Sequence, residues 1–290
     1  MSMLSLEQIR LMARFELLGR KRPHAAEVGN YHAHSHGSGL EFDELREYSI
    51  GDDVRMIDWN SSVRTDSLLV KKYREEINRT IMVFIDGSSS LFYGSSGLVK
   101  YELAAEVAGL IVASGFYNND SVGVMLYNDR SSQMVRPSLN PIKFVEIMNL
   151  LYGYYAQERT TASLQKALEY YMKFQKKPSL IVIISDFFDE NYKHALIAAR
   201  KVHDIVVLRI SDSKEQYFDI PASCDLIDNE SLEIISSITV GEAPYLATII
   251  RQWYDQQTIF FKYHRMPYYD VISTRHSWEQ LIQFLRNTHT

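Results

Sequence analysis

The sequence predicts an α/β fold in which a mostly parallel sheet carries helices on both faces, with an extension on its amino-terminal side. Residues 80–85, 180–185 and 205–210 form short, continuously apolar runs, as expected for strands buried on both faces. Segments with helical periodicity alternate with these runs, whereas residues 1–78 lack this alternation of strand and helix patterns. We therefore expect an extension at residues 1–78 and an α/β domain at residues 79–290.

The remaining elements follow from periodicity, with Pro141 favouring a helix start and Ser277 a helix cap. We expect further strands at residues 121–127 and 269–272, with Met134 and Val135 in a short hairpin partner of the first. We expect a hairpin over residues 225–235 and helices at residues 5–18, 100–117, 141–152, 164–174, 192–202, 243–264 and 277–286.

Composition narrows the class of protein. The chain has 290 residues, of which 46% are apolar, enough for a sizeable core, and its net charge of −5 does not favour binding to nucleic acid or anionic membranes. Cys224 is the one cysteine, so no disulfide can form within the chain. The best membrane candidate, residues 104–116, is short and contains Glu106, and the first 22 residues lack the apolar stretch of a signal peptide. We expect a soluble, cytoplasmic protein without a membrane span.

The motif D-x-S-x-S carries the sharpest chemical signal. Asp86, Ser88 and Ser90 directly follow the first apolar strand, and Asp186 directly follows the strand at residues 180–185. Carboxyl ends of parallel strands form the binding crevice of such sheets, and hard cations prefer oxygen ligands. We expect Ser88 and Ser90 to bind a divalent metal ion directly, and Asp86 and Asp186 to act mostly through water. A partner's carboxylate would complete the site, and we expect no catalytic turnover.

Other interpretations stay open at this stage. The motif is also typical of an ordinary Asp/Ser turn that caps a helix. A metal-dependent hydrolase or nuclease could use Asp86 and Asp186, although such chemistry normally gathers several carboxylates. A serine hydrolase using Ser88 or Ser89 lacks the G-x-S-x-G motif.

Two segments of the extension carry weaker signals. The alternating histidines His32, His34 and His36 could bind a metal, but a solvated loop is the better interpretation of this polar segment. Residues 41–65 alternate in charge, which favours a structural brace over a contact surface, with Tyr48, Ile57 and Trp59 as anchors against the main domain.

The same segment carries a family resemblance. The pattern L-x-F-x-x-L-R-x-Y-x-x-G-D-D-x-R-x-I-D-W is matched at Leu40, Phe42, Leu45, Arg46, Tyr48, Gly51, Asp52, Asp53, Arg55, Ile57, Asp58 and Trp59. It resembles the bacterial and archaeal domain of unknown function 58 family, from about Phe15 to Pro221. The resemblance implies a von Willebrand factor A-like (vWA-like), Rossmann-type fold. It also implies an adaptor or chaperone-like partner of a MoxR-type AAA+ ATPase and its client proteins.

The resemblance also implies a metal-ion-dependent adhesion site, with one departure. Asp86, Ser88, Ser90 and Asp186 match the vWA pattern, but Ala162 occupies the position of its metal-binding threonine. Thr161 or Ser163 could serve after a one-residue shift, or a water could fill in, and a degenerate site is also possible. We take Thr161 as the fifth ligand and Mg²⁺ as the expected ion, with Mn²⁺ or Ca²⁺ as alternatives.

Overall fold

The computed structural model describes residues 40–65, 67–75, 79–95, 99–155, 160–189, 191–212, 214–215, 224–227, 234–238 and 241–273. The chain divides into two compact units between Asn78 and Arg79. The predicted helices at residues 5–18 and 277–286 lie outside the described residues, as do His32, His34 and His36.

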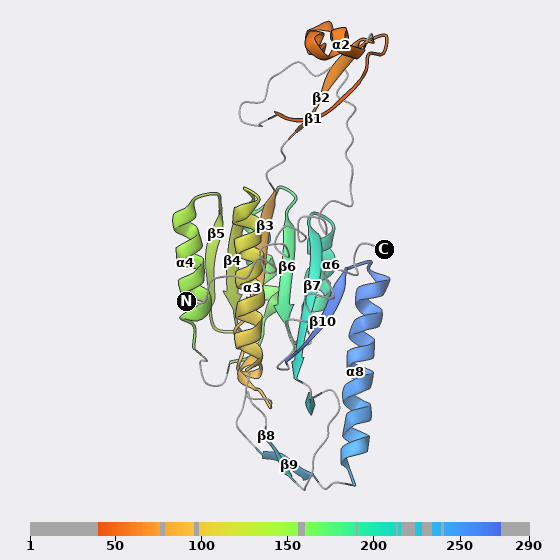
Figure 1. Ribbon diagram of the computed structural model, residues 1–290. Helices are drawn as coiled ribbons and strands as arrows, with labels where there is room; N and C mark the ends of the chain where they lie inside the picture. Colours follow the sequence, from red (N-terminus) through yellow and green to blue (C-terminus); the bar gives the residue numbers. More distant parts are fainter. Residues whose placement is uncertain are drawn as a thin grey trace. The chain divides into compact units, whose positions relative to one another are not determined.

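The smaller unit is a two-stranded antiparallel hairpin with two short helices in its connection (Figure 1). The strands are β1 (Leu40–Glu47) and β2 (Leu69–Glu75), and the helices are η1 (Val54–Met56) and α2 (Trp59–Thr65). The connection turns at Gly51, whose φ of 112° favours glycine.

Several charged residues of this unit make hydrogen bonds within the unit itself. Arg46 donates two hydrogen bonds to Asp52, at 2.7 and 2.6 Å. Asp53 caps η1 and Asp58 caps α2 by accepting backbone N–H groups. These contacts fit a structural role for the family pattern within its own unit. Ile57 is buried and Trp59 is 62% exposed, and their anchoring against the larger unit stays a prediction.

The larger unit contains the predicted sheet. Its strands lie in the order β10-β7-β6-β3-β4-β5, all parallel except the edge strand β5. The bounds are β3 (Thr80–Asp86), β4 (Ser121–Tyr127), β5 (Ser132–Ser138), β6 (Leu180–Ser185), β7 (Asp204–Asp212) and β10 (Tyr268–Ser273). Numbered within this six-stranded sheet, the order is 3-2-1-4-5-6 from β5 to β10, which is the Rossmann order. This confirms the predicted α/β class with a mostly parallel, Rossmann-type sheet.

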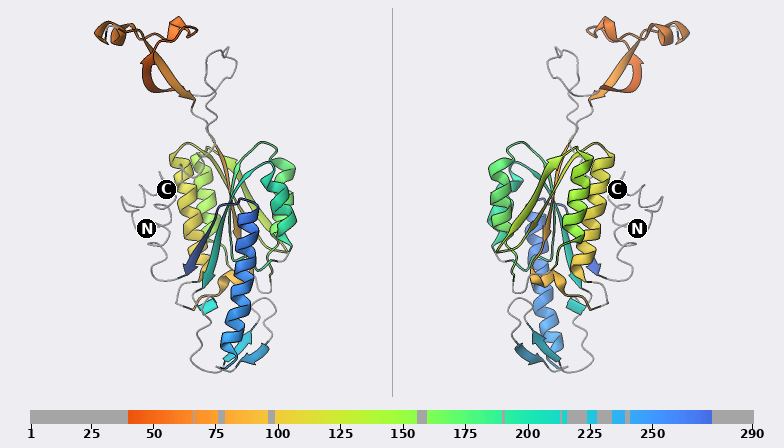
Figure 2. Two further views of the ribbon diagram at one scale, coloured as in Figure 1. Left: turned by 90° about the vertical axis from the view of Figure 1, so that its right-hand side faces the viewer. Right: turned by 90° about the vertical axis from the view of Figure 1, so that its left-hand side faces the viewer.

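Helices cover both faces of the sheet (Figure 2). One face packs on α3 (Lys100–Tyr117) and α4 (Pro141–Tyr152), and the other on α5 (Leu164–Phe174), α6 (Tyr192–Arg200) and α8 (Ala243–Tyr263). Alternate residues of β3 explain the arrangement, since Val83 and Ile85 enter the first core and Met82 and Phe84 the second. Among the described residues, no helix is both long and apolar enough to cross a bilayer.

Most predicted elements are confirmed, with small shifts at their ends. The helix that begins at Tyr192 stops at Arg200 because the chain turns there, and β7 extends to Asp212. A hairpin of β8 (Cys224–Ile227) and β9 (Ile234–Ile238) forms, while its predicted turn lies outside the described residues. The 3-10 helix η2 (Ser89–Phe92) within the D-x-S-x-S segment was not predicted.

Candidate metal centre

Asp86 ends β3 at the point where the strand order reverses, between β3 and β6. This is the switch point at which ligands bind in open α/β sheets. Both carboxyl oxygens of Asp86 are held: the Ser88 N–H donates to Oδ1 at 2.8 Å, and the Ser185 hydroxyl donates to Oδ2 at 2.7 Å. Asp86 is therefore fixed in a buried position and keeps little freedom to move toward a ligand.

The two serine hydroxyls of the motif lie side by side. Ser88 Oγ and Ser90 Oγ are 2.9 Å apart. Adjacent oxygen ligands of an octahedral Mg²⁺ ion are separated by about 3 Å, because each lies roughly 2.1 Å from the ion at a right angle to the other. Ser88 is buried and Ser90 is half-buried, so the pair lies at the edge of the core. The hydroxyls fit two neighbouring positions around one small cation.

Asp186 reaches the same edge from the end of β6. It is buried, and the Phe188 N–H donates to its Oδ1 at 3.3 Å. Phe187 has a φ of 59°, a left-handed conformation that costs a bulky residue about 1–3 kcal/mol. The Ser185 hydroxyl accepts its N–H, and Gln257 donates to its carbonyl, both at 2.9 Å. The fold thus holds this loop in a strained conformation beside Asp86.

The proximity of two carboxyl groups shows in their electrostatics. Burial raises the pKa of Asp86 most, and the Asp186 carboxylate raises it further, against hydrogen bonds from Ser185 and Ser88 that lower it. The pKa of Asp86 reaches about 7. A cation bound between these groups would relieve both the burial cost and the repulsion.

The third predicted loop meets the motif through a different threonine. The Thr160 N–H donates to Ser89 Oγ at 3.0 Å, and the Ser89 N–H donates to the Thr160 carbonyl at 3.0 Å. The Thr161 N–H instead donates to the Asp129 carboxylate at 3.0 Å, and the Asp129 N–H donates to the Thr161 carbonyl at 2.8 Å. The structure thus brings together Asp86, Ser88, Ser90 and Asp186, while the loop contacts the motif through Thr160 rather than Thr161.

Further contacts hold the loops together. Asp189, three residues after Asp186, accepts the first N–H of α5 at Leu164 at 2.9 Å. The Tyr154 hydroxyl donates to the Gly87 carbonyl at 2.8 Å, and its ring lies so close that a Cβ on Gly87 would meet Tyr154 Oη at 2.9 Å. Glycine is therefore needed here for close packing.

Sequence reasoning missed a buried cation next to the site. Lys100, the first residue of α3, is fully buried, and its Nζ lies 3.1 Å from Asp186 Oδ2 and 2.7 Å from Glu215 Oε1. Burial lowers the pKa of Lys100, but the two carboxylates outweigh it and leave the pKa above its usual value. A lone lysine at a helix start gave no signal, because such residues are usually solvated.

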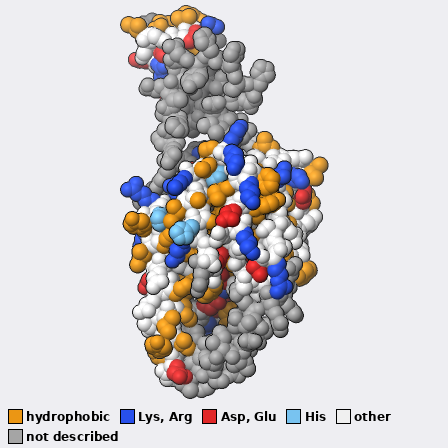
Figure 3. Space-filling model, turned by 180° about the vertical axis from the view of Figure 1, so that it is seen from behind, with side chains coloured by type: hydrophobic (Ala, Val, Ile, Leu, Met, Phe, Trp, Pro, Cys, Tyr) orange, Lys and Arg blue, Asp and Glu red, His pale blue; other side chains and the backbone are white. Residues whose placement is uncertain are grey.

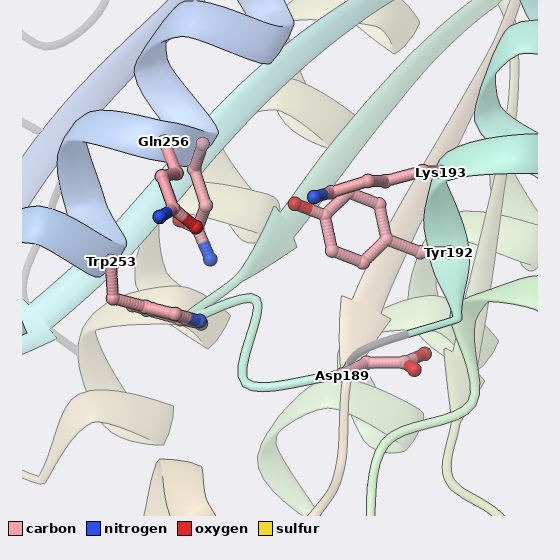
Figure 4. A pocket seen from close by; sticks show the side chains of 6 residues that line it. Asp189, Tyr192, Lys193, Trp253 and Gln256 are labelled. Atoms are coloured by element: carbon pink, nitrogen blue, oxygen red, sulfur yellow. The ribbon is translucent and has the colours of Figure 1, made fainter.

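A pocket of about 290 Å³ opens beside this loop. In Figure 4, Trp253 and Gln256 approach from α8, Tyr192 and Lys193 approach from α6, and Asp189 lies on the loop after β6. The Trp253 ring stacks on the ring of Phe188, with centroids 4.5 Å apart. The pocket therefore adjoins the Asp186 loop and offers an aromatic face with both signs of charge.

The described residues contain no group of three or more His, Cys, Asp or Glu side chains that could hold a metal ion. An ion at the switch point would therefore depend on the serine hydroxyls for part of its coordination. On the face in Figure 3, the coloured residues mix hydrophobic side chains with charges of both signs and form no continuous basic track.

Comparisons with known proteins fit this picture. The model of a family described as "Protein of unknown function DUF58" matches residues 44–254. Uncharacterized proteins of Mycobacterium tuberculosis (strain H37Rv) and Mycobacterium bovis are each 25% identical over 182 residues, which cover 62% of this chain and 57% of theirs. The chain thus matches little more than half the length of these relatives.

Solved structures give weaker likenesses. An aerotolerance-related membrane protein from Bacteroides fragilis has a TM-score of 0.48 at 15% identity, covering 72% of this chain and 100% of that one. BatB, a conserved hypothetical protein from Bacteroides thetaiotaomicron, has a TM-score of 0.43 at 11% identity, covering 72% and 98%. Neither supports a transfer of function, because both TM-scores lie below 0.5.

Proposed function

This chain belongs to the DUF58 family of proteins of unknown function, and we propose that it is a non-catalytic protein-interaction module with a metal-ion-dependent adhesion-type site. In this proposal, Asp86, Ser88, Ser90 and Asp186 would hold a divalent ion at the switch point, and the ion would supply a binding position for an acidic side chain of a partner protein. The observation that carries it is the 2.9 Å separation of the Ser88 and Ser90 hydroxyls at the edge that also holds the buried Asp86 and Asp186.

The roles of the residues follow from their contacts. Ser88 and Ser90 would bind the ion directly. Because their hydroxyls are neutral, they would leave the ion electron-poor, so that it would attract a carboxylate of the partner. Asp86, whose oxygens already accept from Ser88 and Ser185, would act through bound water, as would Asp186. Thr161, whose backbone bonds to Asp129, is the weakest of the predicted ligands. When bound, the ion, Mg²⁺ or else Mn²⁺ or Ca²⁺, supplies an open coordination position for a carboxylate oxygen.

The partner that we propose is a MoxR-type AAA+ ATPase, with its client proteins, in the cytoplasm. The support is the family resemblance at residues 40–59. The pocket between α6 and α8 would receive residues that flank the acidic side chain of the partner. Its aromatic face at Trp253 and its charges at Lys193 and Asp189 suit a polypeptide.

The test is a binding titration of the full chain against a purified MoxR-type ATPase, in Mg²⁺ and in chelator. We expect binding in Mg²⁺ that is lost in chelator and lost in Asp86→Ala. Asp255→Ala is the matched control, because Asp255 is an exposed aspartate on α8. Binding that ignores the chelator, or that survives Asp86→Ala unchanged, would contradict the adhesion mechanism.

A second arm addresses the enzyme alternative. Two-metal hydrolysis needs several carboxylates around its ions, and the Asp86–Asp186 pair is accompanied by serine hydroxyls instead. Phosphodiester or ester turnover that disappears in Asp86→Ala, but persists in Asp255→Ala, would replace the binding proposal with a hydrolase.

A further inference from the structure

Lys100 occupies an unusual position for a cation. It begins α3, and the amino-terminal end of a helix carries a partial positive charge that disfavours a nearby ammonium. Its side chain is also completely buried, which makes an unpaired charge costly. The position is therefore tolerable only because carboxylates of other segments surround the ammonium.

Those carboxylates belong to the candidate metal centre and its border. Asp186 Oδ2 lies 3.1 Å from Lys100 Nζ, and Glu215 Oε1 lies 2.7 Å from it. The rings of Phe188 and Tyr93 also lie near the ammonium, with centroids 5.4 and 6.0 Å away. The Phe188 and Tyr93 side chains are partly exposed, while the ammonium beneath them is not.

The charges at this edge are thus already partly balanced by the chain itself. Asp186 and Glu215 share one ammonium, and Asp86 interacts with the charge of Asp186. A second cation brought to Asp186 would be repelled by Lys100, and it would have to replace an opposite charge of the kind that, within about 4–6 Å, stabilises a carboxylate by about one to three pKa units. The ammonium therefore competes with any metal ion for the charge of Asp186.

We propose that Lys100 is a resident counter-cation that keeps the affinity of this site for a divalent metal ion low, so that the ion is held firmly only when a partner's carboxylate joins it. The inference rests on the proposed function and adds its regulation. Ion binding and partner binding become mutually dependent, because the partner supplies the negative charge that Lys100 has neutralised. An adhesion site of this kind would stay largely empty until its partner arrives.

A purely structural role for Lys100 predicts something different. If the ion pair only stabilised the fold, its removal would weaken ion binding or leave it unchanged, because a loosened loop positions Asp186 less well. A counter-cation predicts the opposite sign. Two substitutions with opposite expected effects separate these explanations.

The experiment is a calorimetric titration of the full chain with Mn²⁺ alone. We expect Lys100→Met to tighten Mn²⁺ binding about tenfold or more, because Asp186 loses its competing cation. We expect Glu215→Gln to weaken binding several-fold, because it removes negative charge and leaves Lys100 paired with Asp186 alone. The matched control is Lys143→Met, which removes a partly exposed lysine on α4 and should leave the affinity unchanged.

The outcomes distinguish this inference from the proposed function. If the wild type binds Mn²⁺ and folded Lys100→Met binds it equally or more weakly, the counter-cation role is overturned and the proposed function is not. Binding in Lys100→Met that is undetectable in the wild type supports the counter-cation, and the ATPase titration in Mg²⁺ and in chelator then decides the proposed function. Absence of binding in all four folded proteins overturns both. If Lys100→Met does not fold, Glu215→Gln decides: weaker binding supports the inference, and equal or tighter binding overturns it.

Discussion

Replacement of Asp86 by asparagine should stabilise the metal-free protein at neutral and higher pH. The folded-state pKa of Asp86 is raised from 3.8 to about 7, chiefly by burial and next by the Asp186 carboxylate. A carboxyl group with a raised pKa contributes stability that is fully present below its unfolded pKa. That stability is lost as the pH rises through the folded pKa. Asparagine carries no such penalty, because it does not ionise.

The structure sets the size of the effect. A shift of about three pKa units corresponds to about 4 kcal/mol in the free energy of unfolding. Asparagine preserves the contacts, since its Oδ1 can accept the Ser88 N–H and its amide can donate to Ser185 Oγ. The gain of Asp86→Asn over the wild type should therefore be small at about pH 4.5 and reach about 4 kcal/mol at about pH 8.

Urea unfolding in chelator, followed by circular dichroism at both pH values, measures this difference. Asp255→Asn is the control for the loss of an exposed carboxylate, and its effect should stay within about 0.5 kcal/mol. If Asp86→Asn is no more stable relative to the wild type at high pH than at low pH, the buried charge of Asp86 is not the dominant cost, and the reasoning fails.

Three further predictions concern the site. Mn²⁺ affinity should rise with pH and level off above about 7, because the ion competes with the proton on Asp86; a flat calorimetric profile would contradict this. Gly87→Ala should lower the free energy of unfolding by about 1–3 kcal/mol, as measured by urea unfolding, because its Cβ meets Tyr154. This loss should shrink in the Tyr154→Ala background, and an unchanged loss there would contradict the prediction. Trp253→Ala should weaken ATPase binding about tenfold or more while leaving Mn²⁺ affinity unchanged. If the ATPase titration and the Mn²⁺ titration both show weaker binding, Trp253 belongs to the ion site instead.

The fold could be predicted because burial on both faces leaves a plain mark on the sequence. Strands such as β3 and β6 are covered on both sides, so residues 81–85 and 181–184 are all buried and apolar. Element ends were less certain, since turn geometry at Arg200 and Asp212 depends on the packing around them.

The candidate site could be predicted only where it follows a strand directly. Asp86 ends β3 and Asp186 directly follows β6, its parallel neighbour, so topology alone places them together. The threonine could not be placed, because the loop before α5 has no periodicity and a shift of one residue exchanges Thr161 for Thr160. Lys100 was missed because its burial depends on the carboxylates of two other segments.

The central claim is that the motif hydroxyls hold a divalent ion, and the most direct measurement is an electron paramagnetic resonance titration of Mn²⁺ into the full chain and its serine variants. We predict one saturable site in the wild type, a loss of affinity of about tenfold or more in Ser88→Ala, and no change in Ser132→Ala, which removes an exposed hydroxyl on β5. Identical titrations for the wild type and Ser88→Ala would contradict it.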